Sequence, residues 1–247
     1  MKLIITTSVV CLALTGCQTT QNIKTQPENQ QSSDVTKKTD SPSVPIHQAA
    51  YKGDVETIKQ HLNSGTSVNK TNQYGATPLH YAARAGKDKV VALLVKYKAN
   101  VNLKDSKEIT PLHSASSGGH AKAVSVLIEN GADWNITCGE RKEPALFAAV
   151  NKNRANVVNI LISNGADVNA KDAFAETALD SAVSKGLPEM VALLVSKGAN
   201  VNGNGGTSPL HKAASTGKKE IVEILLANKA NINISIAFGD TPLDWAI

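Results

Sequence analysis

The sequence predicts an all-α solenoid of helix–turn–helix units joined by β-hairpin-like loops, because two landmarks recur with one period. A leucine recurs in steps of 33, 34, 33, 31 and 33 residues, at Leu79, Leu112, Leu146, Leu179, Leu210 and Leu243. An asparagine near the end of each unit keeps the same register, at Asn69, Asn102, Asn135, Asn169, Asn202 and Asn233. A fixed period of this length is typical of repeat architectures, in which each unit buries its apolar surface against its neighbours.

The unit from residue 72 to residue 102 shows why each element forms. Thr77 can N-cap a helix, and Pro78 suits the first helical position, where its missing N–H costs nothing. Gly86 can end that first helix because glycine takes positive φ freely. We expect the second helix to be covered on both sides, because it carries an apolar surface too wide for one neighbour, formed by Val90, Val91, Leu93, Leu94 and Val95.

The opening Thr-Pro-Leu-His of this unit, residues 77–80, returns as the segments 110–113, 177–180, 208–211 and 241–244 with few changes. Together with a closing G-A-D/N-V-N, this pattern resembles the ankyrin repeat over roughly residues 42–247. The resemblance implies an ankyrin-repeat domain at 44–247, with six repeats and a partial seventh that stops within its first helix. It also implies that the motif histidines tie neighbouring loops together through backbone hydrogen bonds, rather than forming a metal or catalytic site, at His80, His113 and His211.

Three units depart from the pattern. The second helix of repeat one is more polar, with Gln60 and His61 where repeat two has leucines, as expected of an N-terminal cap. Repeat four has a loop one residue longer, crowded with charge, and Phe147 in the place of the motif histidine. Repeat six has a loop shortened by two residues at 203–206.

The N-terminus is similar to a bacterial lipoprotein signal. Lys2 precedes a short apolar run, and the segment 14–17 reads Leu-Thr-Gly-Cys, which resembles a lipobox. The resemblance implies a signal peptide at 1–16, cleavage before Cys17, and a diacylglyceryl group on that cysteine. An ordinary signal with a chance cysteine is the alternative. Gln18, in place of an aspartate that commonly retains lipoproteins in the inner membrane, favours the periplasmic face of the outer membrane in a Gram-negative bacterium.

Residues 17–43 comprise the expected lipidated cysteine and a flexible tether. The segment is rich in Gln, Thr, Asn, Ser and Lys and has almost no apolar side chains, so it cannot bury enough surface to offset its ordering entropy. A flexible chain of this length has a root-mean-square span of roughly 25–30 Å. We therefore expect the repeat domain to reach away from its anchor.

The sequence offers no case for an enzyme, a cofactor, a metal site or a small-molecule substrate. The net charge of +5 is nearly balanced and forms no basic stripe, so we do not expect nucleic acid binding. No phosphate loop, serine-nucleophile motif or zinc-type cysteine pair is present. With Cys11 removed and Cys17 lipidated, Cys138 is alone; we expect an inert, partly buried thiol, with cross-linking to a partner as the alternative.

The resemblance to ankyrin repeats implies partner binding on the hairpin tips and the exposed face of the first helices, where aromatic and basic side chains form a ridge. The predicted contact residues are Tyr51, Lys52, Tyr74, Tyr81, Arg84, Lys107, Ser117, Glu140, Arg141, Lys142, Asn151, Lys152, Phe174, Lys185 and Lys212. Packing against adjacent hairpins is the alternative for Tyr74 and Phe174.

The sequence thus predicts a monomeric, membrane-anchored periplasmic module that binds another, unknown protein of the cell envelope. An inhibitor or immunity protein for a periplasmic enzyme or toxin is the alternative, with the deviant repeat four as its dedicated contact.

Overall fold

The computed structural model describes residues 42–203, 206–236 and 238–246, and it confirms an all-α repeat fold. The first helices of the six repeats are α1 (Ile46–Lys52), α3 (Pro78–Arg84), α5 (Pro111–Gly118), α7 (Ala145–Asn151), α9 (Ala178–Lys185) and α11 (Pro209–Ser215). The second helices are α2 (Val55–Asn63), α4 (Asp88–Lys96), α6 (Ala121–Glu129), α8 (Ala155–Ser163), α10 (Pro188–Ser196) and α12 (Lys219–Ala227). The hairpin of repeat four contains two short antiparallel strands, β1 (Thr137–Cys138) and β2 (Glu143–Pro144).

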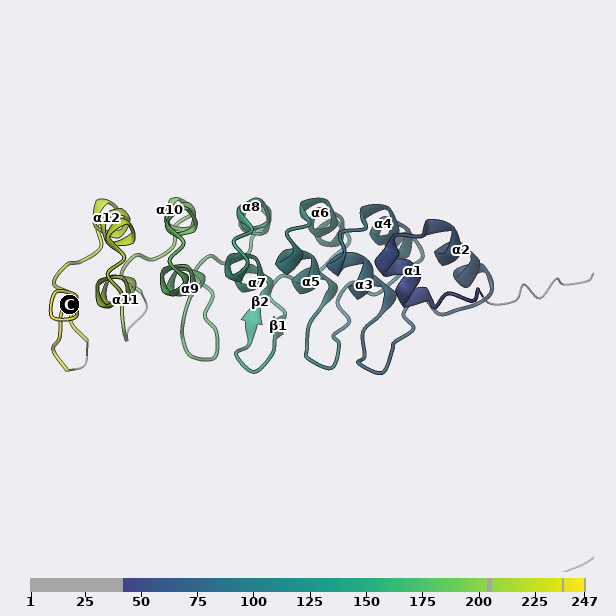
Figure 1. Ribbon diagram of the computed structural model, residues 1–247, viewed down its shortest axis with the longest axis horizontal. Helices are drawn as coiled ribbons and strands as arrows, with labels where there is room; N and C mark the ends of the chain where they lie inside the picture. The colour runs from purple at the N-terminus through teal and green to yellow at the C-terminus, as the bar shows by residue number, and fades with distance from the viewer. Residues whose placement is uncertain (1–41, 204–205, 237, 247) are drawn as a thin grey trace, which may run out of the picture. The chain divides into compact units, whose positions relative to one another are not determined.

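Within the repeat domain, the first helices form one row and the second helices another, with the loops projecting beyond the first helices (Figure 1). The predictions for residues 1–41 lie outside the described residues; they concern the signal peptide, the lipidation of Cys17, the sorting role of Gln18 and most of the tether. No helix in the described ranges is long and apolar enough to cross a membrane.

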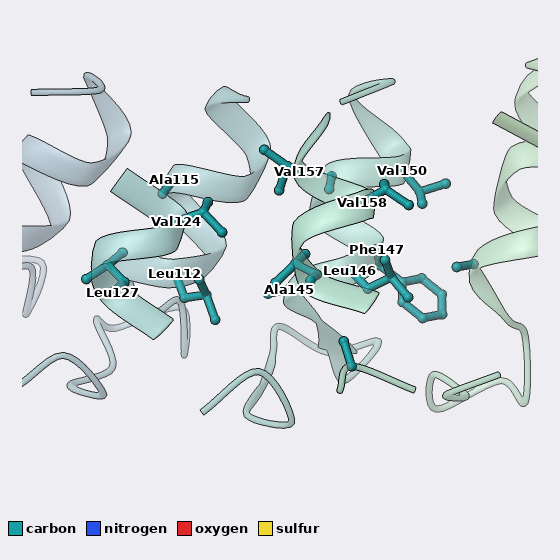
Figure 2. Packing of buried hydrophobic residues seen from close by; sticks show 14 of the residues in the cluster. Leu112, Ala115, Val124, Leu127, Ala145, Leu146, Phe147, Val150, Val157 and Val158 are labelled. Carbon is teal, nitrogen blue, oxygen red and sulfur yellow. The ribbon is translucent and has the colours of Figure 1, made fainter. Parts of the chain in front are cut away.

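The core is a continuous layer of small aliphatic side chains between successive repeats. As predicted, α4 packs against helices of both neighbouring repeats, α2 and α6. Val90, Val91 and Leu94 of α4 are completely buried, and burying each such side chain contributes about 1.5–3 kcal/mol. The same positions are buried in the next two repeats, as Val124 and Leu127 in repeat three and as Val157 and Val158 in repeat four (Figure 2).

The motif histidines link each repeat to the next, as the resemblance implied. Nδ1 of His80 accepts the backbone N–H of Thr77 at 3.1 Å, and Nε2 donates to the carbonyl of Ile109 at 3.0 Å. His113 repeats this arrangement and donates to the carbonyl of Glu143 at 3.2 Å. His211 donates to the carbonyl of Asp240 at 3.1 Å, but the partner of its Nδ1 is the Ser208 hydroxyl at 2.8 Å. In His80 and His113 both ring nitrogens have backbone partners, so these two histidines act as neutral structural bridges.

The periodic asparagines form a second set of links. The carboxamide oxygen of Asn69 accepts the backbone N–H of Asn100, at the matching turn of the next repeat, at 2.9 Å. Asn102, Asn169 and Asn202 make the same bond to the following repeat. Their register is therefore kept by contacts between repeats, in addition to the turn chemistry that the sequence indicated.

A third set of links was not foreseen from the sequence. Polar residues at the N-caps of second helices form hydrogen bonds with carbonyls near the end of the first helix of the preceding repeat. Nε2 of His120 lies 3.0 Å from the carbonyl oxygen of Arg84, and Lys218 donates to two such carbonyls at 2.8 Å. The imidazole of His120 covers Gly86, where a Cβ would lie 2.3 Å from Nδ1. Gly86 is thus required for this contact as well as for its positive φ of 63°.

Two ends of the array differ from expectation. His61, expected on the polar side of the cap, is buried, and its Nε2 lies 2.7 Å from the carbonyl oxygen of Val44. The chain entering repeat one therefore supplies the partner that this imidazole needs. In the partial seventh repeat, residues 242–245 form turns instead of the expected first helix, although Asp244 still accepts the Thr241 N–H in the capping arrangement.

Candidate partner-binding groove

A hollow of about 750 Å³ opens between the hairpins and the first helices of repeats two to four. The hairpin tips of repeats two and three form one side, α3 and α5 form the base, and residues of repeat four close the end. We call this hollow the groove. Five of the predicted contact residues line it, namely Tyr74, Tyr81, Arg84, Lys107 and Ser117.

The aromatic side of the groove is held in place before any partner arrives. The Tyr81 ring meets the rings of His47 and Tyr51 edge-on, with centroids 5.6 and 6.5 Å apart. The Tyr81 hydroxyl oxygen accepts a hydrogen bond from the Asn72 amide at 2.9 Å, so its own proton is free to be donated. Tyr74 at the hairpin tip is 59% exposed. A fixed aromatic surface loses little conformational entropy on binding.

The rim of the groove is rich in hydrogen-bond donors. Arg84 and Lys107 are exposed, and neither side chain forms an ion pair within the described ranges. One acidic residue, Asp105, also lines the groove, but its Oδ1 already accepts the backbone N–H groups of Lys107 and Ile109 at 2.8 and 3.0 Å. The groove therefore presents two unpaired cations to a partner.

The floor of the groove is electrically neutral at neutral pH. Burial lowers the pKa of His113 to about 4, and burial likewise lowers the pKa of His80. Cys138 lines the far end, where burial and, next, the nearby Glu143 raise the pKa of its thiol to about 11. A thiolate is the reactive form of cysteine, so this protonated thiol fits the inert interpretation.

A second group of predicted residues lies in repeats four to six and forms a network of ion pairs. In Arg141, Nη2 lies 2.5 Å from Asp172 and 2.6 Å from Glu176, and Nε lies 3.1 Å from Glu143. Nζ of Lys212 lies 3.0 Å from both Glu176 and Asp180. We call these six residues the ion-pair cluster: Arg141, Glu143, Asp172, Glu176, Asp180 and Lys212.

Arg141 and Lys212, which the sequence predicts as contacts for a partner, are both engaged in ion pairs within the chain. The Lys212 side chain is only 18% exposed, and the Arg141 guanidinium lies 4.8 Å from the centroid of the exposed Phe174 ring. Both side chains therefore form contacts between repeats. Their role in partner binding stays a prediction.

The remaining predicted contacts lie apart from the groove. Lys142 pairs with Glu108 at 2.5 Å, and Asn151 accepts the Ser181 hydroxyl at 2.7 Å. Four further predicted residues are exposed and form no side-chain hydrogen bond or ion pair in the described part of the chain, namely Lys52, Glu140, Lys152 and Lys185.

Sequence reasoning missed the ion-pair cluster, although a signal was present. Four of its five pairs join residues about one period apart; for example, Arg141 and Glu176 are separated by 35 positions, and Glu176 and Lys212 by 36. Opposite charges at that spacing occupy adjacent repeats. Within the described residues, no group of three or more His, Cys, Asp or Glu side chains could hold a metal ion.

The stacked helix pairs with projecting hairpins show that this is a helical repeat protein. Comparisons with known protein families identify the type of repeat. Models described as ankyrin repeats match residues 46–138, 136–205 and 194–246. The chain therefore belongs to the ankyrin-repeat family. No protein with a curated description matches it significantly.

Solved structures of ankyrin repeat domains are similar to this chain. The ankyrin repeat domain of human ASB11 is 28% identical, with a TM-score of 0.74, and the match covers 83% of this chain and 92% of that one. The ankyrin repeat domain of Bcl-3, a member of the IkappaB protein family, is also 28% identical, with a TM-score of 0.76 and coverage of 84% and 95%. Ankyrin repeat domains are protein–protein interaction modules, and this chain carries such a domain.

Proposed function

We propose that the protein is a lipid-anchored module of the bacterial envelope that binds an acidic segment of another envelope protein in the groove. The observation that carries this proposal is the pair of unpaired cations, Arg84 and Lys107, at the rim of a hollow that also presents Tyr74 and Tyr81. Every other part of the proposal depends on this site or on the N-terminal motif.

The chemistry of the groove favours a carboxylate-bearing partner. Arginine and tyrosine side chains at the centre of an interface commonly dominate the binding energy. A guanidinium binds a carboxylate through charge-assisted hydrogen bonds, which are stronger than neutral ones. By contrast, Arg141 and Lys212 already have carboxylate partners within the chain. Arg84 and Lys107 are therefore the cations best placed to attract an acidic segment.

The lipobox-like segment that ends at Cys17 supports the anchor and the location. A single acyl chain gives marginal membrane binding, whereas the several chains of a lipoprotein hold it stably. With the anchor at Cys17 and Gln18 next to it, the repeat domain would face the periplasm from the outer membrane. We propose binding without catalysis, as a monomer and without a cofactor.

An inhibitor or immunity role is the second candidate, and the repeat-four hairpin favours it. This hairpin contains the strands β1 and β2, is one residue longer than the loops before it, and exposes Glu140 at its tip. A deviant loop on an otherwise regular array is suited to one particular partner.

Capture from detergent-solubilised membranes of the native bacterium tests the proposal. The bait is the full-length lipidated protein, compared with an Arg84→Ala/Lys107→Ala variant and with a Lys96→Ala/Lys122→Ala variant, which removes two exposed lysines from the second helices. We expect a partner that the wild type and the second-helix variant retain and the groove variant loses. A stoichiometric enzyme or toxin silenced by binding would select the inhibitor role, and several partners would select a scaffold. Equal capture by all three baits would contradict the groove as the site.

A further inference from the structure

The histidine link between repeats is missing at two adjacent junctions. At the junction of repeats four and five, Phe147 occupies the histidine place, and at the junction of repeats five and six Asp180 does so. The Phe147 ring is buried and points toward the following repeat (Figure 2), and it has no hydrogen-bond donor. Asp180 accepts the Thr177 N–H, as a motif histidine does, but a carboxylate cannot donate to the next hairpin.

The ion-pair cluster spans these same two junctions. Arg141 extends from the hairpin of repeat four to Asp172 and Glu176 in the hairpin of repeat five. Lys212 of α11 extends from repeat six back to Glu176 and Asp180. Because Glu176 contacts both cations, one continuous series of charges connects three repeats.

We propose that the ion-pair cluster replaces the missing histidine bonds and makes repeats four to six an electrostatically coupled hinge within the array. At the other motif junctions an imidazole donates a hydrogen bond to a backbone carbonyl, and salt screens such a bond less than it screens an ion pair. Coupling at the hinge depends on charges that are partly exposed, such as Arg141, whose side chain is 46% exposed. Salt screens such charges, so the hinge weakens under conditions that leave repeats two and three unchanged.

A weakened junction has a specific consequence in a repeat protein. Stability is approximately a sum of repeat terms and nearest-neighbour interface terms, so loss of one interface uncouples the segments on either side. Repeats one to three, which supply most of the groove, would stay folded while the segment from repeat five onward opens. The inference concerns the array itself and does not depend on the proposed partner.

The charge environment of Glu176 supports this assignment. Burial alone would raise its pKa, but Lys212 and Arg141 outweigh burial and hold the pKa below its usual range. The Asp172 side chain is fully buried, so removing its partner Arg141 would leave a buried carboxylate without an opposite charge. The charged groups that meet here are the six members of the ion-pair cluster.

Hydrogen exchange of the full-length protein at neutral pH tests the hinge. Glu176→Gln removes the shared charge with little change of shape. We expect amides of residues 172–185 to exchange about fivefold faster in this variant, the size expected for losing a partly exposed ion pair, while residues 105–118 are unchanged. The matched control is Lys142→Gln, which removes the 2.5 Å ion pair to Glu108 at a junction that keeps its histidine link. This control should leave exchange in both segments unchanged.

Two further experiments test the hinge even if the Glu176→Gln variant folds poorly. In the wild type, raising KCl from about 50 mM to about 1 M should speed exchange in residues 172–185 relative to residues 105–118. Asp180→His should restore the neutral link at the junction of repeats five and six and reduce the effect of Glu176→Gln there. The proposal would be overturned if the ratio of the exchange rates of the two segments were the same at both salt concentrations, or if Lys142→Gln had an effect as large as that of Glu176→Gln.

Discussion

Nε2 of His113 lies 3.2 Å from the carbonyl oxygen of Glu143, thirty residues further along the chain, while Nδ1 of the same ring accepts the N–H of Thr110 at 3.3 Å. This imidazole must be neutral, because a proton on Nδ1 would face the donating N–H. Burial accordingly lowers the pKa of His113 from 6.5 to about 4. The link between repeats three and four is therefore sensitive to acid.

The first prediction follows from that shift. A group whose pKa is lower in the folded state contributes its full stability above the unfolded pKa and loses it as pH falls toward the folded value. For His113 this window runs from pH 6.5 down to about pH 4. Across it the free energy of unfolding should fall by about 3 kcal/mol. Urea unfolding at several pH values measures it. In His113→Gln the slope across this window should become smaller, and an unchanged slope would show that His113 is not the titrating group.

The second prediction concerns Ser116, whose buried hydroxyl oxygen has no hydrogen-bond partner in the described structure. Leaving such a group unsatisfied costs about 1–3 kcal/mol, so Ser116→Ala should raise the free energy of unfolding by about 1 kcal/mol. The neighbouring Ser117→Ala, at a partly exposed site, should change it by less than about 0.5 kcal/mol. A destabilised Ser116→Ala protein in urea unfolding would mean that the hydroxyl has a partner after all.

The third prediction concerns the hairpin of repeat five. Ala175 has a φ of 61°, in the left-handed region that favours glycine. Ala175→Gly should therefore stabilise the protein by about 0.5 kcal/mol, since relief of backbone strain exceeds the added entropy of the unfolded chain. Ala173→Gly, in the same hairpin but without positive φ, should destabilise it slightly. The melting temperatures of the two variants should shift in opposite directions from that of the wild type. A shift in the same direction for both would refute the strain argument.

The fourth prediction tests the anchor. Cys17→Ser should abolish acylation and release the protein from the membrane fraction, because no other acylation site is proposed. Labelling with a fatty-acid probe followed by fractionation measures both effects. Gln18→Asp should shift the lipidated protein toward the inner membrane. Fatty-acid label that persists on the Cys17→Ser protein would contradict the assignment.

Much of this molecule could be predicted from sequence because the repeat enforces its own register. The residues Thr77, His80 and Leu94 of one unit predict where their counterparts lie in the other units, although Phe147 and Asp180 replace the histidine in two of them. The structure confirms that Thr77 is the N-cap of α3, that His80 links two repeats and that Leu94 is buried. Some residues of the groove could also be predicted, because Tyr81 and Arg84 lie on the exposed face expected of the first helices.

The ion-pair cluster and the buried His61 could not be predicted in the same way. Arg141 lies near carboxylates on two repeats, and side-chain conformation decides which it contacts. His61 is buried, and the carbonyl of Val44, at the start of repeat one, lies within hydrogen-bond distance of its Nε2. Periodicity places the charges of the cluster on adjacent repeats, but the positions of the side chains in three dimensions decide which charges meet and how far His61 is buried.

The central claim is that Arg84 binds a carboxylate of the partner in the groove, and charge exchange with the captured partner tests it most directly. Arg84→Glu should weaken binding by at least about thirtyfold, as for a hot-spot arginine. Reversing the matching acidic residue of the partner to lysine should restore most of that loss, because contacting residues show coupling that distant ones do not. Dissociation constants for the four combinations give the coupling energy. If no acidic residue of the partner rescues Arg84→Glu, so that both changes simply add, the acidic-segment account of the groove is wrong.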